Sequence, residues 1–421
     1  MKRARVRGIR VAAVAVLSLA FVTVGSSAAH ADLVRDYQYW LSDYGFTTAW
    51  NTSRGDGVTV AVIDTGVDGT VAEMQGAIVG GTDVSGIGSP NGQTPVGTDD
   101  SHGTMVAGLL AGRGSGPGNG VIGVAPDADL LTISVAFGAN TGATSDNDTQ
   151  IAEAVRWAVD NGADVINMSL TRNTADWPES WDDAFMYAFE NDVVIVAAAG
   201  NRGAGTTAVG APATIPGVLT VAGVNRDKVA SFDASSQGIT IGVAAPSEDL
   251  VGVIPGGSYV KWNGTSGAAP LVSGLVALVR AAYPDLDAGN VINRITATAD
   301  LNGHEAGGPI YGYGLINPPG ALTADVPLVD KDPAAELAEW IRVHRRADVP
   351  PDQSGETPVP QEIVPIKDPP LPRAANEASL FPTTWTLTYI TLPLVVVTGF
   401  GTLAALLGIG ATRQLKRAAR E

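Results

Sequence analysis

The sequence predicts an α/β fold in which a mainly parallel β-sheet is covered by helices on both faces. Between residues 58 and 316, short apolar segments rich in β-branched residues alternate with segments of helical periodicity. Nearly continuous apolar strands are typical of parallel sheets that are buried on both sides. Because reactive groups in such sheets gather where the strands end, we expect a functional site at the carboxyl ends of the strands.

Nine segments carry this pattern. The predicted strands are VTVAVID (58–64), DLLTISVA (129–136), DVINMSL (164–170), VVIVAAAG (193–200) and LTVAGV (219–224). The predicted helices cover residues 102–112, 150–162, 181–191 and 266–283. A chain of 421 residues, 45% of them hydrophobic, can bury one large core and still carry appendages. It contains no cysteine, which excludes disulfides and cysteine-based chemistry.

The N-terminal 31 residues have the pattern of a secretory signal peptide. Five basic residues in MKRARVRGIR precede an apolar run from Val11 to Val24, and Ala29-His30-Ala31 provides a small-x-small cleavage signal. We expect cleavage after Ala31, which leaves residues 32–50 as a short N-terminal extension. An uncleaved anchor is the alternative, but the apolar run is short for one.

A linker is predicted over residues 326–384. It begins with one short helix at 333–347 and continues as an extended spacer, because eight of the 23 residues from 350 to 372 are proline.

The sequence predicts one C-terminal transmembrane helix at 385–411. This segment is mostly apolar and long enough to cross a bilayer, and no charged residue lies between Glu377 and Arg413. The tail at 412–421 carries four basic residues and one acidic residue, which predicts a cytoplasmic tail and an extracytoplasmic main domain. A buried core helix is the alternative, but the segment lies beyond the linker.

The remaining part of the chain is strongly acidic. Without the signal peptide and the tail, 17 basic and 42 acidic residues give a net charge of −25. Such a surface makes nucleic acid and anionic lipid poor partners. The acidity favours solubility and does not identify a substrate.

Two candidate residues form the first half of a possible catalytic group. Asp64 ends a predicted strand before Thr65-Gly66, where a carboxylate points toward the crevice, although a lone Asp at such a place is more often a turn residue. His102 begins a predicted apolar helix and is a candidate base or a structural histidine. The other histidine within the domain, His304, lies in a glycine-rich loop and is more typical of a solvated residue.

Asn201 and Ser266 form the second half. Asn201 follows an apolar strand and is either a turn residue or an amide donor to a developing oxyanion. Ser266, in NGTSGAAP (263–270), begins a predicted helix, where it is either an N-cap or a nucleophile favoured by the helix N-terminus. Pro270 is expected in the first helical turn, where its missing N–H costs little. An acid, a base, an amide donor and a hydroxyl thus follow in the order Asp–His–Asn–Ser, and the order Asp…His…Ser distinguishes one class of triad from others.

These stretches resemble the signature blocks of the subtilisin-like serine proteases. The blocks are VAVIDTGVD (60–68), HGTMVAGLLAG (102–112), AAAGN (197–201) and NGTSGAAP (263–270), and the similarity covers about residues 47–318. The resemblance implies a subtilisin-like three-layer catalytic domain, with expected bounds 51–325, and a serine endopeptidase that acts on protein or peptide substrates.

The resemblance also implies residue roles. Asp64, His102 and Ser266 match the catalytic triad, and Asn201 matches the oxyanion-hole donor. Substrate-binding roles fall on Ser169, Leu170 and Gly200, and Pro212 matches a position that is often a cis proline. No metal or organic cofactor is implied, and no clear calcium site is evident. Gly267 and Thr171 depart from the family pattern, in which a bulky residue and a glycine are frequent.

The whole layout is similar to that of the mycosins, membrane-anchored subtilases associated with type VII secretion in actinobacteria. This resemblance implies a single-pass protein of the cell membrane that cleaves exported proteins near a type VII secretion complex. A structural subunit of that complex and a general cell-surface degradative protease remain the alternatives.

Overall fold

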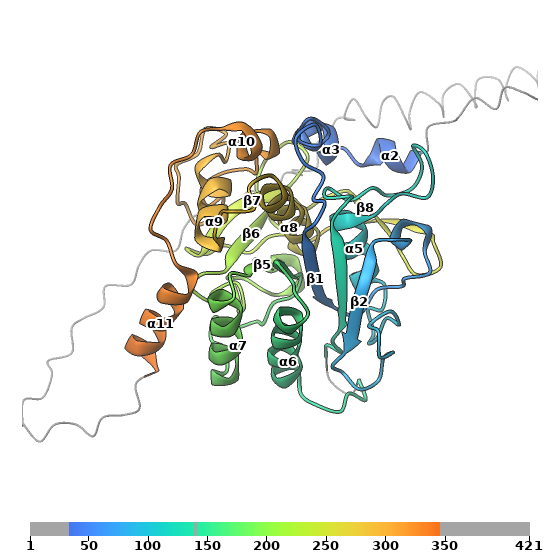
Figure 1. Ribbon diagram of the computed structural model, residues 1–421, viewed down its shortest axis with the longest axis horizontal. Helices are drawn as coiled ribbons and strands as arrows, with labels where there is room; N and C mark the ends of the chain where they lie inside the picture. The colour runs from blue at the N-terminus through green and yellow to red at the C-terminus, as the bar shows by residue number, and fades with distance from the viewer. Residues whose placement is uncertain (1–32, 139–140, 346–421) are drawn as a thin grey trace, which may run out of the picture. The chain divides into compact units, whose positions relative to one another are not determined.

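The computed structural model describes residues 33–138 and 141–345, and it confirms the predicted α/β fold (Figure 1). A seven-stranded sheet has the order β2-β3-β1-β4-β5-β6-β7, and all neighbouring strands are parallel. The strands are β1 (Thr59–Asp64), β2 (Ile78–Asp83), β3 (Asp129–Ser134), β4 (Val165–Met168), β5 (Val194–Ala198), β6 (Leu219–Val224) and β7 (Ile241–Pro246). The central strands β4, β5 and β6 are buried along their whole length, as expected for a sheet covered on both faces.

Helices cover both faces of the sheet. Figure 1 shows α6 (Asn147–Asp160) and α7 (Glu179–Glu190) on one side, with α8 (Thr265–Ala282) and α9 (Ala288–Ala297) on the other. Helix α5 (His102–Ala111) packs against α8, and α10 (Pro318–Thr323) follows α9. Two short 3₁₀ helices, η1 (Ala72–Met74) and η2 (Arg202–Ala204), lie in connections.

Among the described residues, α8 alone is long and apolar enough to cross a membrane, but 78% of it is buried inside the domain. It packs against strands β4 to β7. It is therefore the central core helix of the domain.

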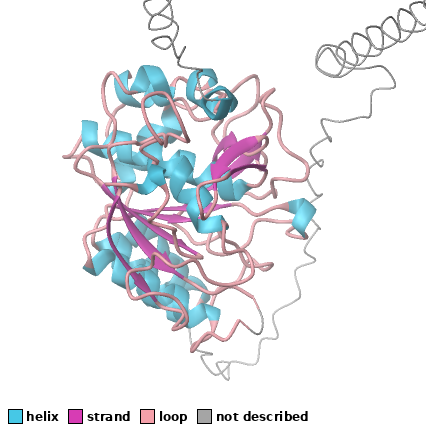
Figure 2. Cartoon of the chain, turned by 90° about the vertical axis from the view of Figure 1, so that its right-hand side faces the viewer, coloured by secondary structure: helices cyan, strands magenta, loops and turns pink. Residues whose placement is uncertain are grey.

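Several structural elements lie outside the sequence-based expectation, among them strand β7. A separate antiparallel hairpin is formed by β8 (Leu250–Val253) and β9 (Tyr259–Trp262), visible as a second group of strands in Figure 2. The edge strand β2 is only partly buried and contains two adjacent glycines, so it lacks the apolar run by which the five predicted strands were recognised. The peptide bond between Ala211 and Pro212 is cis.

The N-terminal extension packs into the same core as the sheet. It folds into α2 (Leu33–Tyr37), α3 (Trp40–Asp43) and α4 (Phe46–Ala49), and the side chains of Trp40 and Phe46 are fully buried. Gln38 exchanges two hydrogen bonds with the backbone of Ile122, donating through Nε2 at 2.7 Å and accepting through Oε1 at 2.9 Å.

The predicted linker helix is present as α11 (Pro333–His344) and packs against α7. The rings of Trp340 and Trp177 lie 4.2 Å apart, and Arg345 pairs with Asp182 at 2.9 Å. The predicted signal peptide, the rest of the linker, the C-terminal span and the tail lie outside the described residues.

Candidate active site

Three adjacent strands end at the candidate site. Asp64 is the last residue of β1, Ser169 follows β4, and Asn201 follows β5 by three positions. Because these strands are parallel neighbours, their carboxyl ends lie at the same edge of the sheet. Helices α5 and α8 add His102 and Ser266 from their N-terminal turns.

His102 and Asp64 form a hydrogen-bonded pair. The Nδ1 atom of His102 lies 2.8 Å from Oδ1 of Asp64, which also accepts a hydrogen bond from the Thr65 backbone N–H at 2.7 Å. The Asp64 side chain is 1% exposed and that of His102 is 18% exposed. Because an ionised carboxylate only accepts hydrogen bonds, the Nδ1 atom carries the proton, and Nε2 is left to act as a base.

Several groups around His102 change its pKa. Burial of the imidazole by itself lowers the pKa. The charge of Asp64, its hydrogen bond to the ring and the charge of Asp99 outweigh this effect, so the pKa lies above its ordinary value of 6.5. The protonated ring is therefore well stabilised, as a base that must hold a proton during a reaction requires.

Ser266 lies inside α8 rather than at its cap. The N-cap is Gly264, the helix begins at Thr265, and Pro270 is therefore an interior residue in the second turn. The expectation that Pro270 occupies the first turn is wrong, because Pro270 is the sixth residue of a helix that begins at Thr265, and a turn takes only 3.6 residues. The Ser266 hydroxyl donates to the Ser169 carbonyl oxygen at 3.1 Å, and no hydrogen bond within the described residues joins it to His102.

Asn201 presents a free amide donor. Its Oδ1 accepts from the backbone N–H of Thr265 at 2.8 Å and from the Thr265 hydroxyl at 3.0 Å. These two bonds fix the side chain, and its Nδ2 has no acceptor within the described ranges; neither has the Ser266 backbone N–H. Gly264 has φ +145°, and a Cβ there would lie 3.1 Å from Nδ2, so glycine keeps this donor uncrowded.

The three residues with expected substrate-binding roles lie in different settings. Leu170 lines a cavity of about 370 Å³ together with His102, Asp99 and Ser169. Ser169 is 4% exposed, and its hydroxyl donates to the backbone carbonyl of Ser266. The backbone of Gly200 is engaged inside the protein, because its N–H donates to Thr265 Oγ1 at 3.1 Å and its carbonyl accepts from the N–H of Ser236 at 2.8 Å.

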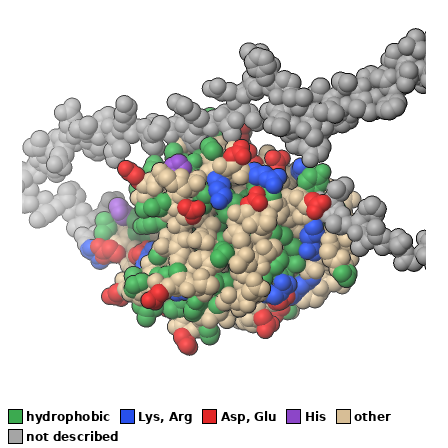
Figure 3. Space-filling view, turned by 90° about the horizontal axis from the view of Figure 1, so that it is seen from above, with side chains coloured by type: hydrophobic (Ala, Val, Ile, Leu, Met, Phe, Trp, Pro, Cys, Tyr) green, Lys and Arg blue, Asp and Glu red, His purple; other side chains and the backbone are tan. Residues whose placement is uncertain are grey.

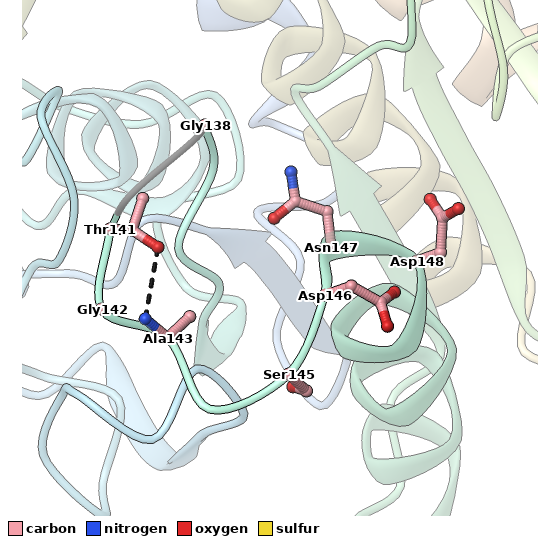
Figure 4. A pocket seen from close by; sticks show the side chains of 8 residues that line it. All are labelled: Gly138, Thr141, Gly142, Ala143, Ser145, Asp146, Asn147 and Asp148. Carbon is pink, nitrogen blue, oxygen red and sulfur yellow. Dashed lines mark hydrogen bonds between the residues drawn. The ribbon is translucent and has the colours of Figure 1, made fainter.

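A second cavity of about 510 Å³ adjoins the first, and Figure 4 shows the residues that line this second cavity. It is lined by Gly138 and by residues of the segment 141–148, and Gly138 and Asn147 line both cavities. The hollow therefore continues from His102 toward the N-terminus of α6.

Sequence reasoning missed Trp262, which lies beside the catalytic candidates. Its ring is 5.8 Å from the His102 ring in an edge-on arrangement. A Cβ at Gly267 would lie 2.2 Å from the Leu250 side chain and 3.2 Å from Trp262. The hairpin β8–β9, which carries Leu250 and Trp262, thus fills the space that a bulky residue after Ser266 would need.

In the part of the chain that the structure describes, no group of three or more His, Cys, Asp or Glu side chains is placed to hold a metal ion. His304 stacks on Tyr311 with the ring centres 3.8 Å apart and lies exposed in its loop.

The family model described as "Subtilase family" matches residues 55–314. The chain therefore belongs to the subtilase family, a class of serine endopeptidases. Subtilisin E from Bacillus subtilis (strain 168) is 36% identical over 266 residues, a match that covers 62% of this chain and 65% of subtilisin E.

Solved structures of mycosins are also similar to this chain. MycP1 with its N-terminal propeptide removed is 33% identical with a TM-score of 0.59, over 69% of this chain and 98% of MycP1. MycP3, a protease from the type VII (ESX-3) secretion system, is 33% identical with a TM-score of 0.57, over 68% of this chain and 88% of MycP3. These similarities confirm the predicted resemblance to subtilases and, among them, to mycosins.

Proposed function

We propose that this chain is a serine endopeptidase in which Ser266 is the nucleophile, His102 the general base and Asp64 the residue that orients the imidazole. The observation that carries this proposal is the buried His102–Asp64 hydrogen bond of 2.8 Å at the strand edge where Ser266 also lies. Membership of the subtilase family supports the same reaction class.

The reaction begins when the Ser266 hydroxyl turns from the Ser169 carbonyl toward His102. Its oxygen bonds to the substrate carbonyl carbon while its proton passes to His102 Nε2. His102 then gives this proton to the leaving amine as the C–N bond breaks, and an acyl-enzyme remains. Water attacks the acyl carbon, one proton of the water passes to His102, and that proton returns to Ser266 as the acid leaves.

Asn201 Nδ2 and the Ser266 backbone N–H serve as donors to the tetrahedral oxyanion. Both are unoccupied by acceptors among the described residues, and the Thr265 contacts hold the amide in place. Loss of one such donor costs about 10²–10³-fold in kcat. We expect Asn201→Ala to lose activity by this factor while its KM changes little, as measured by steady-state peptide hydrolysis.

A fluorophosphonate probe tests the nucleophile. We expect labelling of the wild-type protein and none of Ser266→Ala, with the labelled peptide containing residue 266. Absence of labelling in the wild type, or undiminished labelling of Ser266→Ala, would contradict the proposal.

We further propose that the protein is anchored in the cell membrane with its catalytic domain on the extracytoplasmic side and acts on exported proteins beside a type VII secretion complex. The predicted signal peptide and the predicted span at 385–411 support the anchoring, and the similarity to MycP3 supports the complex. Secretion should be assayed in strains with wild-type protein, with Ser266→Ala and with a deletion. Loss of secretion only in the deletion strain would favour a structural subunit over a required protease.

A further inference from the structure

The backbone carbonyl of Ser266 occupies an exceptional position in α8. In an α-helix this carbonyl accepts the N–H of the residue four positions later, which here is Pro270. Proline has no N–H, and its ring crowds the carbonyl four residues before it. The carbonyl of the proposed nucleophile therefore needs a partner from outside the helix.

Ser169 supplies that partner. Its hydroxyl donates to the Ser266 carbonyl oxygen at 2.8 Å, while its own carbonyl accepts the Ser266 hydroxyl at 3.1 Å. The two residues thus hold each other through a reciprocal pair of hydrogen bonds. Any displacement of Ser169 shifts both the backbone and the hydroxyl of Ser266.

Two further side chains hold Ser169. Asn167, in β4, donates from Nδ2 to the Ser169 hydroxyl oxygen at 3.0 Å, and Ser273, two turns along α8 from Ser266, donates to Asn167 Oδ1 at 2.8 Å. Asn167 and Ser273 are both fully buried. The hydrogen bonds all run in one direction, from Ser273 through Asn167 and Ser169 to Ser266. Hydrogen bonds arranged in such a series strengthen one another in a low-dielectric interior.

We propose that Ser273, Asn167 and Ser169 form a positioning relay that fixes the main chain of Ser266 where Pro270 interrupts the helix. The relay connects β4 with α8 and leaves the Ser266 N–H free to meet an oxyanion. None of its three side chains contacts His102 or Asp64 through any hydrogen bond in the described chain. This inference rests on the proposed role of Ser266 as nucleophile.

The test compares variants of Ser169 that keep or remove the hydroxyl that donates to the Ser266 carbonyl. Ser169→Ala leaves the Ser266 carbonyl without a partner, whereas Ser169→Thr retains a hydroxyl. Because a displacement of about 1 Å at a reacting group can cost 10²-fold, we expect kcat and the rate of fluorophosphonate labelling to fall about 10- to 100-fold in Ser169→Ala. KM and the acidic limb of the pH profile should stay unchanged, and Ser169→Thr should recover most of the rate.

A matched control and a more distant variant complete the experiment. Thr132→Val, at a buried residue of β3, removes one part-buried side-chain hydrogen bond, to the Asn91 carbonyl at 3.2 Å, and should lower stability without lowering kcat. Ser273→Ala removes the outermost link and should give a smaller loss of kcat than Ser169→Ala. Thermal unfolding identifies any variant that fails to fold, and Ser273→Ala then carries the test.

The outcomes separate the relay from the proposed chemistry. Absence of labelling in the wild type contradicts the nucleophile itself. Labelling of the wild type, Ser169→Ala and Ser273→Ala at one rate overturns the relay alone, as does a Ser169→Thr variant that is folded yet as slow as Ser169→Ala.

Discussion

Gly267 and Trp262 occupy one space beside the proposed nucleophile. Because a Cβ at position 267 would lie 2.2 Å from Leu250 and 3.2 Å from Trp262, Gly267→Met forces these side chains to move. Overpacking of this kind costs about 1–3 kcal/mol. We expect a lower melting temperature and a lower kcat/KM, measured by thermal unfolding and peptide hydrolysis.

Removal of the Trp262 ring should reduce the steric overlap in the Gly267→Met variant. The double variant Gly267→Met/Trp262→Ala is expected to be more stable than the sum of the single effects predicts, which a double-mutant cycle measures. Gly308→Met is the control, since a Cβ there meets nothing closer than 3.5 Å. Strict additivity of the two single effects would show that the residues do not share this space.

Asp99 is, after Asp64, a further charge that raises the pKa of His102. Its negative charge is one of the groups that raise the His102 pKa, and it lines the cavity beside the imidazole. A general base must be neutral in the free enzyme, so kcat/KM rises with pH through this pKa. Asp99→Asn removes a charge that favours the protonated ring, and we expect the acidic limb to move to lower pH.

The neighbouring Asp100→Asn provides the matched charge control. It removes the same charge one residue away, at an exposed position that is not among the groups acting on His102. Its acidic limb should move less than that of Asp99→Asn, and added salt should reduce the difference between the two. Equal shifts would mean that the acidic limb of the kcat/KM pH profile depends on net charge rather than on the position of Asp99.

At the scale of elements, the N-terminal extension is part of the catalytic domain's core. Trp40 is fully buried, and complete truncation of a buried Trp costs about 3–5 kcal/mol. We expect Trp40→Ala to lower the free energy of unfolding by this amount in denaturant titrations. Thr47→Ala, at an exposed position in α4, should change it by less than about 0.5 kcal/mol. An unchanged free energy of unfolding in Trp40→Ala would mean that the extension is only loosely attached.

The sequence predicted the elements whose burial is uniform. Strand β6 was expected and found at 219–224, because both of its faces are buried and its residues are apolar throughout. The hairpin β8–β9 was missed, since β9 is only partly buried and includes the charged Lys261. The extension helices were missed because each has five residues or fewer, too few for a helical period to show.

Sequence-based prediction of the site also reached only those residues that stand in a recognisable local pattern. Asp64, His102, Asn201 and Ser266 could be selected because each stands at a strand end or helix start with a recognisable local motif. Asn167 and Ser273 could not, because a polar residue within an apolar strand or helix carries no sign of its partner. Their bond joins residues 106 positions apart, a pairing set only by the packing of α8 on β4.

At the scale of the whole molecule, the acidic surface bears on partners. On the face seen in Figure 3, acidic and basic side chains lie interspersed and do not separate into two regions. An interspersed surface with a negative net charge favours solubility rather than steering of one charged partner. If the protein is anchored as proposed, the predicted membrane span, rather than long-range attraction, would keep it near its substrate.

The absence of cysteine allows a direct test of that span. Single-cysteine variants Ser379→Cys and Ala418→Cys place one thiol on each side of residues 385–411. If the tail is cytoplasmic, a membrane-impermeant maleimide should label Ser379→Cys in intact cells and Ala418→Cys only after permeabilisation. Deletion of residues 346–421 should release the domain from the membrane fraction, because about 20 apolar residues are needed to cross the bilayer. A truncated chain that stays in that fraction, or an Ala418→Cys variant labelled in intact cells, would contradict the predicted topology.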